Sequence, residues 1–407
     1  MSLGAILTVC VISEVAALTE LRSEWRQLHA ATSADLFLSW NWLVPWWRHL
    51  AGDRELFVML ARDDDGLLRG LLALSMETAR VGFRRIRRLR FLGDDQVGSD
   101  YLDALIEPGW NRAVNRAFAA ALLARRSDWD LLELRDMDEH STTAHELLDA
   151  LGDGFDMRSD AGLLCPVQNF DPDQPPAAFM RQTRRFENYT RRRKWLERQP
   201  GFRIEICRDE HSMQPALDNF FRLHRLRWLA DDGSCGIAGG RVEAFHRDAM
   251  PGLMATGQLR LYTLWVDGSA VASVYALIHG QTFYYYQAGM DPAWRSHSVG
   301  LVLIGETFAD AIRCGLTRYD FLRGEEAYKF DWVSGSRRLV RRRLFAHRGS
   351  GASAVRGDVR LSRGRTLVKK WFRQIRPATN ATVSIAAFSL SLGDCHDNRG
   401  KALARSL

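Results

Sequence analysis

The sequence predicts an α/β (α+β) protein built from two tandem units, each a mixed, mostly antiparallel sheet flanked by helices. Two observations lead to this prediction. In the first part of the chain a strand hairpin, a third strand, a helix and a short strand follow one another, and this order recurs in the second part. The length of 407 residues also exceeds that of one ordinary domain.

The first unit is expected to begin with helices at residues 17–31 and 39–50. The stretch 54–78 predicts two strands, because its DDDG sequence supplies a glycine for the tight reversal between them. RIRRLRFLG then predicts a third strand. An Ala- and Leu-rich segment at 111–129 favours a helix, and 130–137 favours a short buried strand.

The second unit repeats this order. In sequence, its expected elements are a strand at 202–207, a helix at 213–233, a hairpin at 258–280 turning at Asp267-Gly268, an aromatic strand at 281–291, a helix at 298–315 ended by Gly315, and a strand at 317–324. A long basic helix is predicted between the units and ends at a Pro-Gly pair. The predicted boundaries are a first domain at 1–176, a bridging helix at 177–201, a second domain at 202–348, and a basic, partly disordered tail at 349–407.

Charge and cysteine usage narrow the function classes. The net charge of +7 is concentrated in three basic runs, at 84–90, 181–198 and 337–343. Such runs indicate either an anionic partner or solvated basic faces. The six cysteines form no CxxC pair and no metal-ligand spacing, which predicts reduced thiols in a cytosolic protein without a metal. The amino terminus is typical of a first strand rather than a signal peptide, and no apolar window is long enough to span a membrane, so we expect a cytoplasmic protein.

Two neighbouring segments of the second unit indicate chemistry. A helix that starts after Arg295, Ser298, Val299 and Gly300 would offer its main-chain amides and an arginine to a pyrophosphate. The following strand leads into TRYDFLRGEEAYKFDWV (317–333), where ionisable groups are dense. A tyrosine there can protonate a leaving thiolate, and a carboxylate can accept a proton from an amine. Alternatively, Asp320 pairs with Arg323 or Lys329 and only fixes the turn.

Taken together, these stretches resemble acetyltransferases of the GNAT superfamily, in the CelD-like branch tied to cellulose and exopolysaccharide synthesis. In the second unit the similarity lies in LYTLWVDGSAVAS, YYYQAGMDPAW, SVGLVLIGETFADAI and above all YDFLRGEEAYKFDW. In the first unit it lies in FLSWNWLVPWW, RRLRFLGDD and GSDYLDALI. The resemblance covers roughly residues 10 to 348 and implies two GNAT-like units, as in FemAB-type aminoacyl transferases, with acetyl-CoA or another acyl-CoA as donor.

The resemblance also implies roles for individual residues. The GNAT pyrophosphate loop corresponds to Arg295, Ser298, Val299 and Gly300, with serine in place of the first glycine. Glycine there allows the backbone to approach the ligand closely, which a serine side chain hinders. The first unit has only IEPGWNRA before its helix, so it is expected to shape the acceptor site. Its candidate contacts are Asp100, Tyr101 and Asp103.

Direct transfer from coenzyme to acceptor in one ternary complex is the implied mechanism. Asp320 is the predicted base or acceptor-positioning group, Tyr328 the acid, and Lys329 a source of positive charge. Tyr286 and Gln287 are expected to line the cleft, and a strand amide to bind the oxyanion. His224 is an alternative base, although a single histidine on an amphipathic helix is more often structural.

Three hypotheses follow for the function. The first is an acyl-CoA-dependent N-acyltransferase that acts on a small molecule, an amino sugar or a glycan precursor. The second is a FemAB-like transferase that uses aminoacyl-tRNA, for which the basic run at 181–198 would provide the nucleic-acid contact. The third is a non-catalytic exopolysaccharide-assembly or nucleic-acid-binding protein on a degenerate transferase scaffold.

Overall fold

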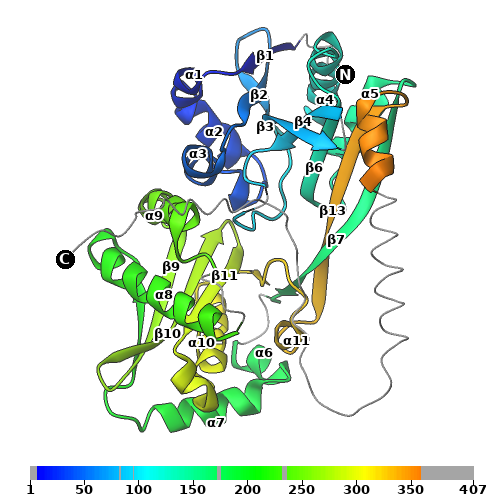
Figure 1. The fold of residues 1–407 in the computed structure, drawn as a ribbon. Helices are drawn as coiled ribbons and strands as arrows, with labels where there is room; N and C mark the ends of the chain where they lie inside the picture. Colours follow the sequence, from blue (N-terminus) through cyan, green and yellow to red (C-terminus); the bar gives the residue numbers. More distant parts are fainter. Residues whose placement is uncertain (1–6, 82–83, 95, 172–175, 232–235, 359–407) are drawn as a thin grey trace, which may run out of the picture. The chain divides into compact units, whose positions relative to one another are not determined.

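A computed structural model describes residues 7–81, 84–94, 96–171, 176–231 and 236–358 of the chain. Its first half, shown in blue to green-cyan in Figure 1, contains these elements in order: β1 (Thr8–Ile12), α1 (Val15–Glu20), α2 (Arg22–Ala31), η1 (Leu36–Leu38), α3 (Trp40–Leu50), β2 (Glu55–Arg62), β3 (Leu68–Val81), β4 (Arg84–Phe91), β5 (Leu105–Ile106), α4 (Asn111–Ala124), β6 (Leu131–Asp138) and α5 (Thr143–Leu151).

The second half follows after a connecting segment. The connecting segment comprises β7 (Phe155–Asn169), α6 (Pro176–Gln182) and α7 (Phe186–Leu196). The second half comprises β8 (Arg203–Cys207), α8 (Glu210–Asp231), α9 (Gly240–Ala255), β9 (Leu259–Val266), β10 (Ser269–His279), β11 (Thr282–Met290), η2 (Pro292–His297), α10 (Val299–Arg313), β12 (Arg318–Asp320) and α11 (Ala327–Phe330). The strand β13 (Gly335–Ala346) and a helical segment at 350–358 come last, and the remainder of the predicted tail lies outside the described residues.

One sheet connects both halves in the order β1-β2-β3-β4-β6-β13-β7-β12-β11-β10-β9-β8, with β5 paired to β3 beside this path. Its pairings are antiparallel except for β4 with β6 and β11 with β12. The predicted mixed, mostly antiparallel sheet flanked by helices is therefore confirmed. Because the sheet runs through both halves without a break, the domain boundaries at 176 and 201 stay predictions.

Each half receives its last strand from the other half. β7 follows the first half in sequence but pairs with β12, whereas β13 follows the second half and pairs with β6. The two exchanged strands also pair with each other, from Gly335 opposite Val167 to Ala346 opposite Phe155. Figure 1 shows them as two long strands side by side. Neither half therefore has a complete sheet of its own.

The bridging segment contains two helices, α6 and α7, where one long helix was predicted. The interruption has a tertiary cause. The amide of Arg184 donates to the carbonyl oxygen of Asp331 at 3.1 Å, and the side chain of Arg185 pairs with the carboxylate of the same aspartate. A hydrogen bond to another part of the chain thus replaces the helical bond that a continuous helix would need at this position.

Two of the three basic runs lie within the sheet and form ion pairs there. In β4, Arg88 and Arg90 both pair with Glu77, at 3.1 and 2.9 Å. In β13, Arg337 pairs with Asp138 at 2.8 Å and Arg343 with Asp358 at 2.8 Å. Much of the charge in these runs is therefore neutralised within the protein.

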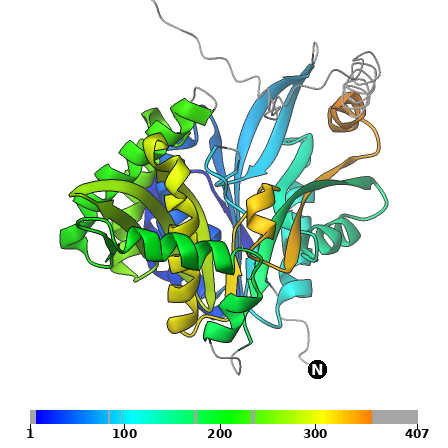
Figure 2. The ribbon, with the colours of Figure 1, turned by 90° about the horizontal axis from the view of Figure 1, so that it is seen from below.

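Two hydrophobic clusters lie on opposite faces of the second half's strands. Phe283, Tyr285 and Tyr319 pack with α10 and with parts of α6 and α7. Tyr284 and Tyr286, which alternate with them along β11, pack with α3 and α9 instead. Figure 2 shows the helices of this half lying against its strands. None of the helices in the described part of the chain is long and apolar enough to cross a membrane.

Candidate active site

The strands β11 and β12 diverge and so open a pocket. They pair in parallel only from Thr282 to Tyr284, opposite Arg318 to Asp320. Beyond this point β11 continues to Met290 without β12 beside it. A pocket of about 440 Å³, here called the α10 pocket, lies against this free part of β11. Its lining residues are Arg185, Asn188, Arg227, Asp231, Tyr285, Ala288, Gly289, Met290, Arg295, Ser298, Gly300, Leu301, Ile304, Tyr328 and Trp332.

The start of α10 forms one wall of the α10 pocket. Ser298 precedes the helix in the left-handed conformation, with φ of 59°, and its side chain makes no capping hydrogen bond. The first amides of a helix have no partner within the helix and carry partial positive charge. At Gly300 an added Cβ would come no closer than 3.7 Å to another atom, the sulfur of Met290. The predicted residues Arg295, Ser298 and Gly300 thus lie together at a surface suited to an anion.

Tyr328 lies in the same pocket, reached from α11. Burial raises the pKa of its phenol to about 12, while the positive charge of Arg227 and a hydrogen bond from it act in the opposite direction. The phenol is therefore protonated at neutral pH and can donate a proton. Arg227 also donates to the carbonyl oxygen of Ala288 at 3.3 Å.

Arg227, Arg185 and Asn188 are pocket residues that the sequence analysis missed. A signal existed for the first of them. The buried side of α8 carries Leu217, Phe220 and His224, and Arg227 follows three positions after the histidine on the same stripe. A charged residue continuing an apolar stripe is a candidate for a lined cavity. Asp231, one turn further, pairs with both Arg227 and Arg295.

Asp320 points to the opposite face of the sheet from the α10 pocket. Tyr319 and Phe321, its neighbours in the chain, pack on the α10 face, and side chains of a strand alternate between faces. The carboxylate of Asp320 is fully buried. It accepts hydrogen bonds from the Tyr101 hydroxyl at 2.8 Å and from the Leu322 amide at 2.7 Å. Burial raises its pKa to about 7, against the effect of the Arg337 guanidinium 3.8 Å away.

Lys329 is buried beside α11 and has two local partners. Its ammonium group donates to the carbonyl oxygen of Arg323 at 2.9 Å and pairs with Glu326 at 3.0 Å. These contacts fix the turn that carries Tyr328. The structure therefore does not bring Asp320, Tyr328 and Lys329 into one cavity, and the catalytic role of each stays a prediction.

An ion-paired cluster joins the loop after β4 to the loop after β12. The Asp100 carboxylate binds both the amide and the guanidinium of Arg323, and Arg323 also pairs with Asp136 at 3.0 Å. Tyr101, Asp136 and Leu322, which lie in or beside this cluster, all have positive φ of 57° to 61°. Such strain in residues other than glycine persists only where the surroundings enforce it, and it is common at functional sites.

Tyr286 lies at an irregularity of β11. Its neighbours Tyr285 and Gln287 pair with Ala276 and Tyr275, and Tyr286 itself has no partner in this register. Its hydroxyl group binds the carbonyl oxygen of Val97 in the first half. Gln287 is half-buried, and neither residue lines the α10 pocket, where Tyr285 stands instead. A bulge re-aims backbone groups, so this part of β11 is where an amide can leave the ladder.

His224 is fully buried and uses both ring nitrogens. Nδ1 lies 3.0 Å from the carbonyl oxygen of Ala288, and Nε2 accepts from the amide of Ile237 at 3.1 Å. The tautomer that satisfies both contacts carries its proton on Nδ1. Burial lowers the pKa of this imidazole to about 4. These contacts describe a neutral side chain that holds α8 against β11.

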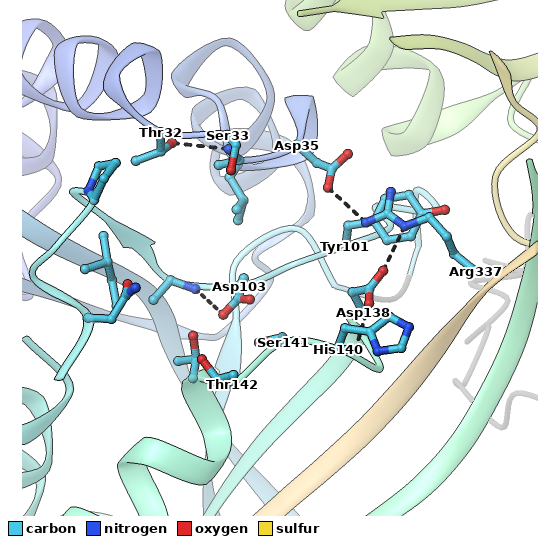
Figure 3. A pocket seen from close by; sticks show the side chains of 17 residues that line it. Thr32, Ser33, Asp35, Tyr101, Asp103, Asp138, His140, Ser141, Thr142 and Arg337 are labelled. Carbon is cyan, nitrogen blue, oxygen red and sulfur yellow. Dashed lines mark hydrogen bonds and ion pairs between the residues drawn. The ribbon is translucent and has the colours of Figure 1, made fainter. Parts of the chain in front are cut away.

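A second pocket, of about 500 Å³ and here called the acidic pocket, lies in the first half and contains Tyr101 and Asp103. Figure 3 shows Asp35 and Asp138 on opposite sides of the Arg337 guanidinium. The guanidinium carbon of Arg337 lies 3.6 Å from the centre of the Tyr101 ring. Within the described residues, no group of three or more histidine, cysteine or acidic side chains is arranged to hold a metal ion.

Comparisons with known proteins agree with this architecture. Residues 182–330 match the family model described as Acetyltransferase (GNAT) domain. The fold is similar to that of FemX, with a TM-score of 0.54 and 12% identity over 80% of this chain and 96% of that one. It is also similar to a conserved protein of unknown function from Bacteroides thetaiotaomicron VPI-5482, with a TM-score of 0.51 and 13% identity over 83% and 100% of the two chains.

A third similar structure is the C-terminal domain of a protein assigned as a lysylphosphatidylglycerol synthetase from Agrobacterium fabrum, with a TM-score of 0.50 and 12% identity over 83% of this chain and 94% of that one. Identities this low show a shared fold and no more. A search of curated proteins found no match. Residues 182–330 thus form a GNAT acetyltransferase domain, which makes the protein an acyltransferase by class.

Proposed function

We propose that the protein is an acyl-CoA-dependent N-acyltransferase, with acetyl-CoA as donor and a small molecule or an amino-sugar or glycan precursor as acceptor. One observation carries the proposal: the free amides of α10, Arg295 and Tyr328 meet in one pocket. An anion-binding helix start and a protonated phenol are the two groups that a phosphate-bearing thioester requires. The CelD-like branch and a cytoplasmic location belong to the same proposal.

The two faces of the sheet suggest how two substrates meet. Tyr328 and the α10 pocket lie on one face, and Asp320 lies on the other, beside the point where β11 and β12 separate. We propose that the coenzyme enters from the α10 face and the acceptor from the Asp320 face. Arg295, Ser298, Val299 and Gly300 would bind the pyrophosphate, and Arg227 and Arg185 would add positive charge.

In the transfer step the amine nitrogen forms a bond to the thioester carbonyl carbon, and the carbon–sulfur bond breaks. The amine proton passes to the Asp320 carboxylate, and the Tyr328 hydroxyl protonates the leaving sulfur. A backbone amide near the irregularity at Tyr286 would bind the oxyanion. Lys329 would act through the turn that positions Tyr328, and its predicted electrostatic role stays part of the proposal.

Ligand-induced thermal stabilisation tests the donor. A ligand at 100 times its Kd stabilises the native state by about 2.7 kcal/mol, so saturating acetyl-CoA is expected to raise the Tm by several degrees. Gly300→Asp is the decisive variant, because aspartate in the first turn favours the helix but repels a pyrophosphate. It should fold as well as the wild type and lose the acetyl-CoA shift.

The corresponding helix of the first half provides the matched control. Asn111→Asp places the same charge in the first turn of α4, outside the α10 pocket, and should leave the shift unchanged. An absent shift in the wild type, or equal shifts in the two variants, would contradict the proposed coenzyme site.

The alternative donor is aminoacyl-tRNA. The fold similarity to FemX and the exposed basic side chains of α6, α7 and their flanks favour it: Arg181, Arg184, Arg191, Lys194 and Arg198. Binding to tRNA falls steeply as salt displaces counterions, by about 10³-fold or more between 50 and 200 mM when many phosphates are contacted. Titrations with tRNA and with acetyl-CoA at both salt concentrations distinguish the two donors.

A further inference from the structure

The acidic pocket has a composition that the coenzyme site does not explain. Its described lining is hydroxylated and acidic: Thr32, Ser33, Asp35, Asp103, Asp138, Ser141, Thr142 and Thr143 contribute polar side chains. Arg337 is the one guanidinium or ammonium group among the lining residues. In Figure 3 the labelled acidic side chains and hydroxyl groups surround a common space. A coenzyme pyrophosphate would meet the wrong charge here.

The carboxylates outnumber the cations that face them. Arg337 is shared among Asp138 at 2.8 Å, Asp35 at 3.7 Å and Asp320 at 3.8 Å. Arg342 also faces Asp103 and Asp138, but its guanidinium donates to the carbonyl oxygens of Ser141 and Glu139. Burial raises the pKa of both Asp35 and Asp103, despite these cations. A ligand that carries positive charge would relieve this excess.

Tyr101 connects the acidic pocket to the predicted base. Its side chain lines the pocket, lies against the Arg337 guanidinium and donates its hydroxyl hydrogen to Asp320 at 2.8 Å. The pocket is therefore separated from Asp320 by one side chain and contacts Asp320 from the face opposite to Tyr328. Tyr101 is also one of the strained residues with positive φ, at 61°. A ligand that displaces its ring would reach the carboxylate.

We propose that the acidic pocket binds the acceptor, and that the acceptor is a primary amine bearing several hydroxyl groups, bound in its ammonium form. This inference rests on the proposed function, because it assigns the acceptor of that reaction. The carboxylates of Asp103 and Asp138 hold the ammonium group and the hydroxyl side chains hold the polyol. Asp320 then takes the proton that the amine must lose before it attacks the thioester carbon, and the released thiolate is protonated by Tyr328.

The volume agrees with a ligand of sugar size. Pockets for small molecules span about 300–1,000 Å³, and the acidic pocket measures about 500 Å³. The position of the binding groups also suits an acceptor. The lining comes from the loop between α2 and α3, from the loops before α4 and α5, and from β13, so both halves contribute.

D-glucosamine is the probe for this site, with D-glucose as its uncharged counterpart. Saturation-transfer NMR and calorimetry on the full chain, without coenzyme, should show saturable binding of glucosamine that exceeds glucose binding by about 10-fold, as a charged hydrogen bond predicts. Asp103→Asn and Asp138→Asn should each weaken glucosamine binding by about 10-fold or more. Each variant keeps an oxygen acceptor, so the local backbone contacts persist.

Asp160→Asn is the matched control, because Asp160 pairs with Arg343 and Arg341 of β13 but lies outside the pocket. It should bind glucosamine as the wild type does. The inference is overturned if glucosamine does not bind saturably, if glucose binds equally well, or if the Asp103 and Asp138 variants retain full affinity. The acetyl-CoA shift is measured separately, so its absence refutes the donor and leaves the binding result for the acidic pocket intact.

Discussion

The two halves of the molecule begin with the same local pattern and then separate. Arg88 to Arg90 of β4 pair in parallel with Leu131 to Glu133 of β6, just as the corresponding residues of β11 and β12 pair over three positions. After this pairing β4 ends at Phe91, whereas β11 runs on to Met290 and lines the α10 pocket. Duplicating the sheet therefore did not duplicate the site.

The chain that leaves β4 serves the other half instead. It supplies the carbonyl oxygen of Val97 to Tyr286, the carboxylate of Asp100 to Arg323 and the hydroxyl group of Tyr101 to Asp320. It then returns as β5 to pair with Gly70 and Leu71 of β3. One half has lost its own pocket at this position and forms a wall of its partner's site.

The largest expected contrast lies between two carboxylates at corresponding positions, Asp320 in β12 and Glu133 in β6. Both are buried, but Glu133 lies within 3.5 Å of Arg88, Arg135 and Arg341, while Asp320 has only Arg337 at 3.8 Å. Asp320→Asn should lower kcat by about 10²- to 10⁴-fold if the carboxylate takes the amine proton. Glu133→Gln should leave kcat nearly unchanged and lower the Tm.

Stability against pH sharpens the same contrast. The pKa of Asp320 rises from 3.8 to about 7 on folding, so the folded state binds an extra proton between these values. The cost of a buried charge is therefore absent below pH 4, grows between pH 4 and 7, and is complete above pH 7. Asp320→Asn should remove this loss of stability in chemical denaturation measured at pH 5 and pH 8. Unchanged turnover in Asp320→Asn, or equal effects of both substitutions, would show that Asp320 is structural.

Tyr328→Phe is expected to have the next largest effect, a fall in kcat of about 10²-fold with little change in KM. The reason is that the phenol, with its pKa raised to about 12, remains protonated and is available to the leaving thiolate. Thiol release in the steady state measures the effect. Tyr285→Phe removes a hydroxyl group from the same pocket and should keep the wild-type rate. Equal rates for the two variants would refute the acid role.

Arg227→Ala should weaken acetyl-CoA binding by about 10-fold, because a charge and its hydrogen bonds are lost from the α10 pocket. Calorimetric titration measures this change. Arg225 lies on the same helix α8 and pairs at the surface with Glu243 at 3.4 Å. Arg225→Ala should bind the coenzyme as the wild type does, and similar losses in the two variants would mean that only the total charge matters.

Ser298→Gly is the smallest change. A residue with a Cβ in the left-handed conformation costs about 1 kcal/mol, so glycine at φ of 59° should raise the free energy of unfolding by up to that amount. Acetyl-CoA binding should be equal or tighter. Val299→Gly lies one residue later, inside α10, and should lower the stability by about 1 kcal/mol. Two variants that both destabilise would contradict the assigned strain.

The sequence predicted those parts of the fold and site that are contiguous in the chain. The helix start at Arg295 to Gly300 and the tyrosine at 328 were found as local patterns, and the structure places Arg295, Ser298, Gly300 and Tyr328 in one pocket. The partners that define their surroundings are remote. Tyr101 and Asp320 are 219 positions apart, and Asp100 and Arg323 are 223 apart. No spacing rule within one sequence reveals such pairs.

The alternation of side chains explains why Asp320 and Tyr328 were expected together. Both belong to one short polar segment, yet the strand turns Asp320 toward one face and the following loop returns Tyr328 to the other. The exchanged strands were not predicted for a related reason. β13 reads GSRRLVRRRLFA, and its arginines do not alternate with apolar residues, because acidic partners on other elements such as Asp138, Asp160 and Asp358 neutralise them.

The exchange of β7 and β13 bears on how the chain is made. The first half leaves the ribosome with β6 still lacking the strand that will cover it, and β7 must wait for Arg318 to Asp320. Open strand edges invite pairing with other chains, and slow, long-range pairings prolong that exposure. Nascent protein should therefore depend on chaperones until its last strand has emerged. Expressing either half alone should yield insoluble material rather than a smaller working enzyme.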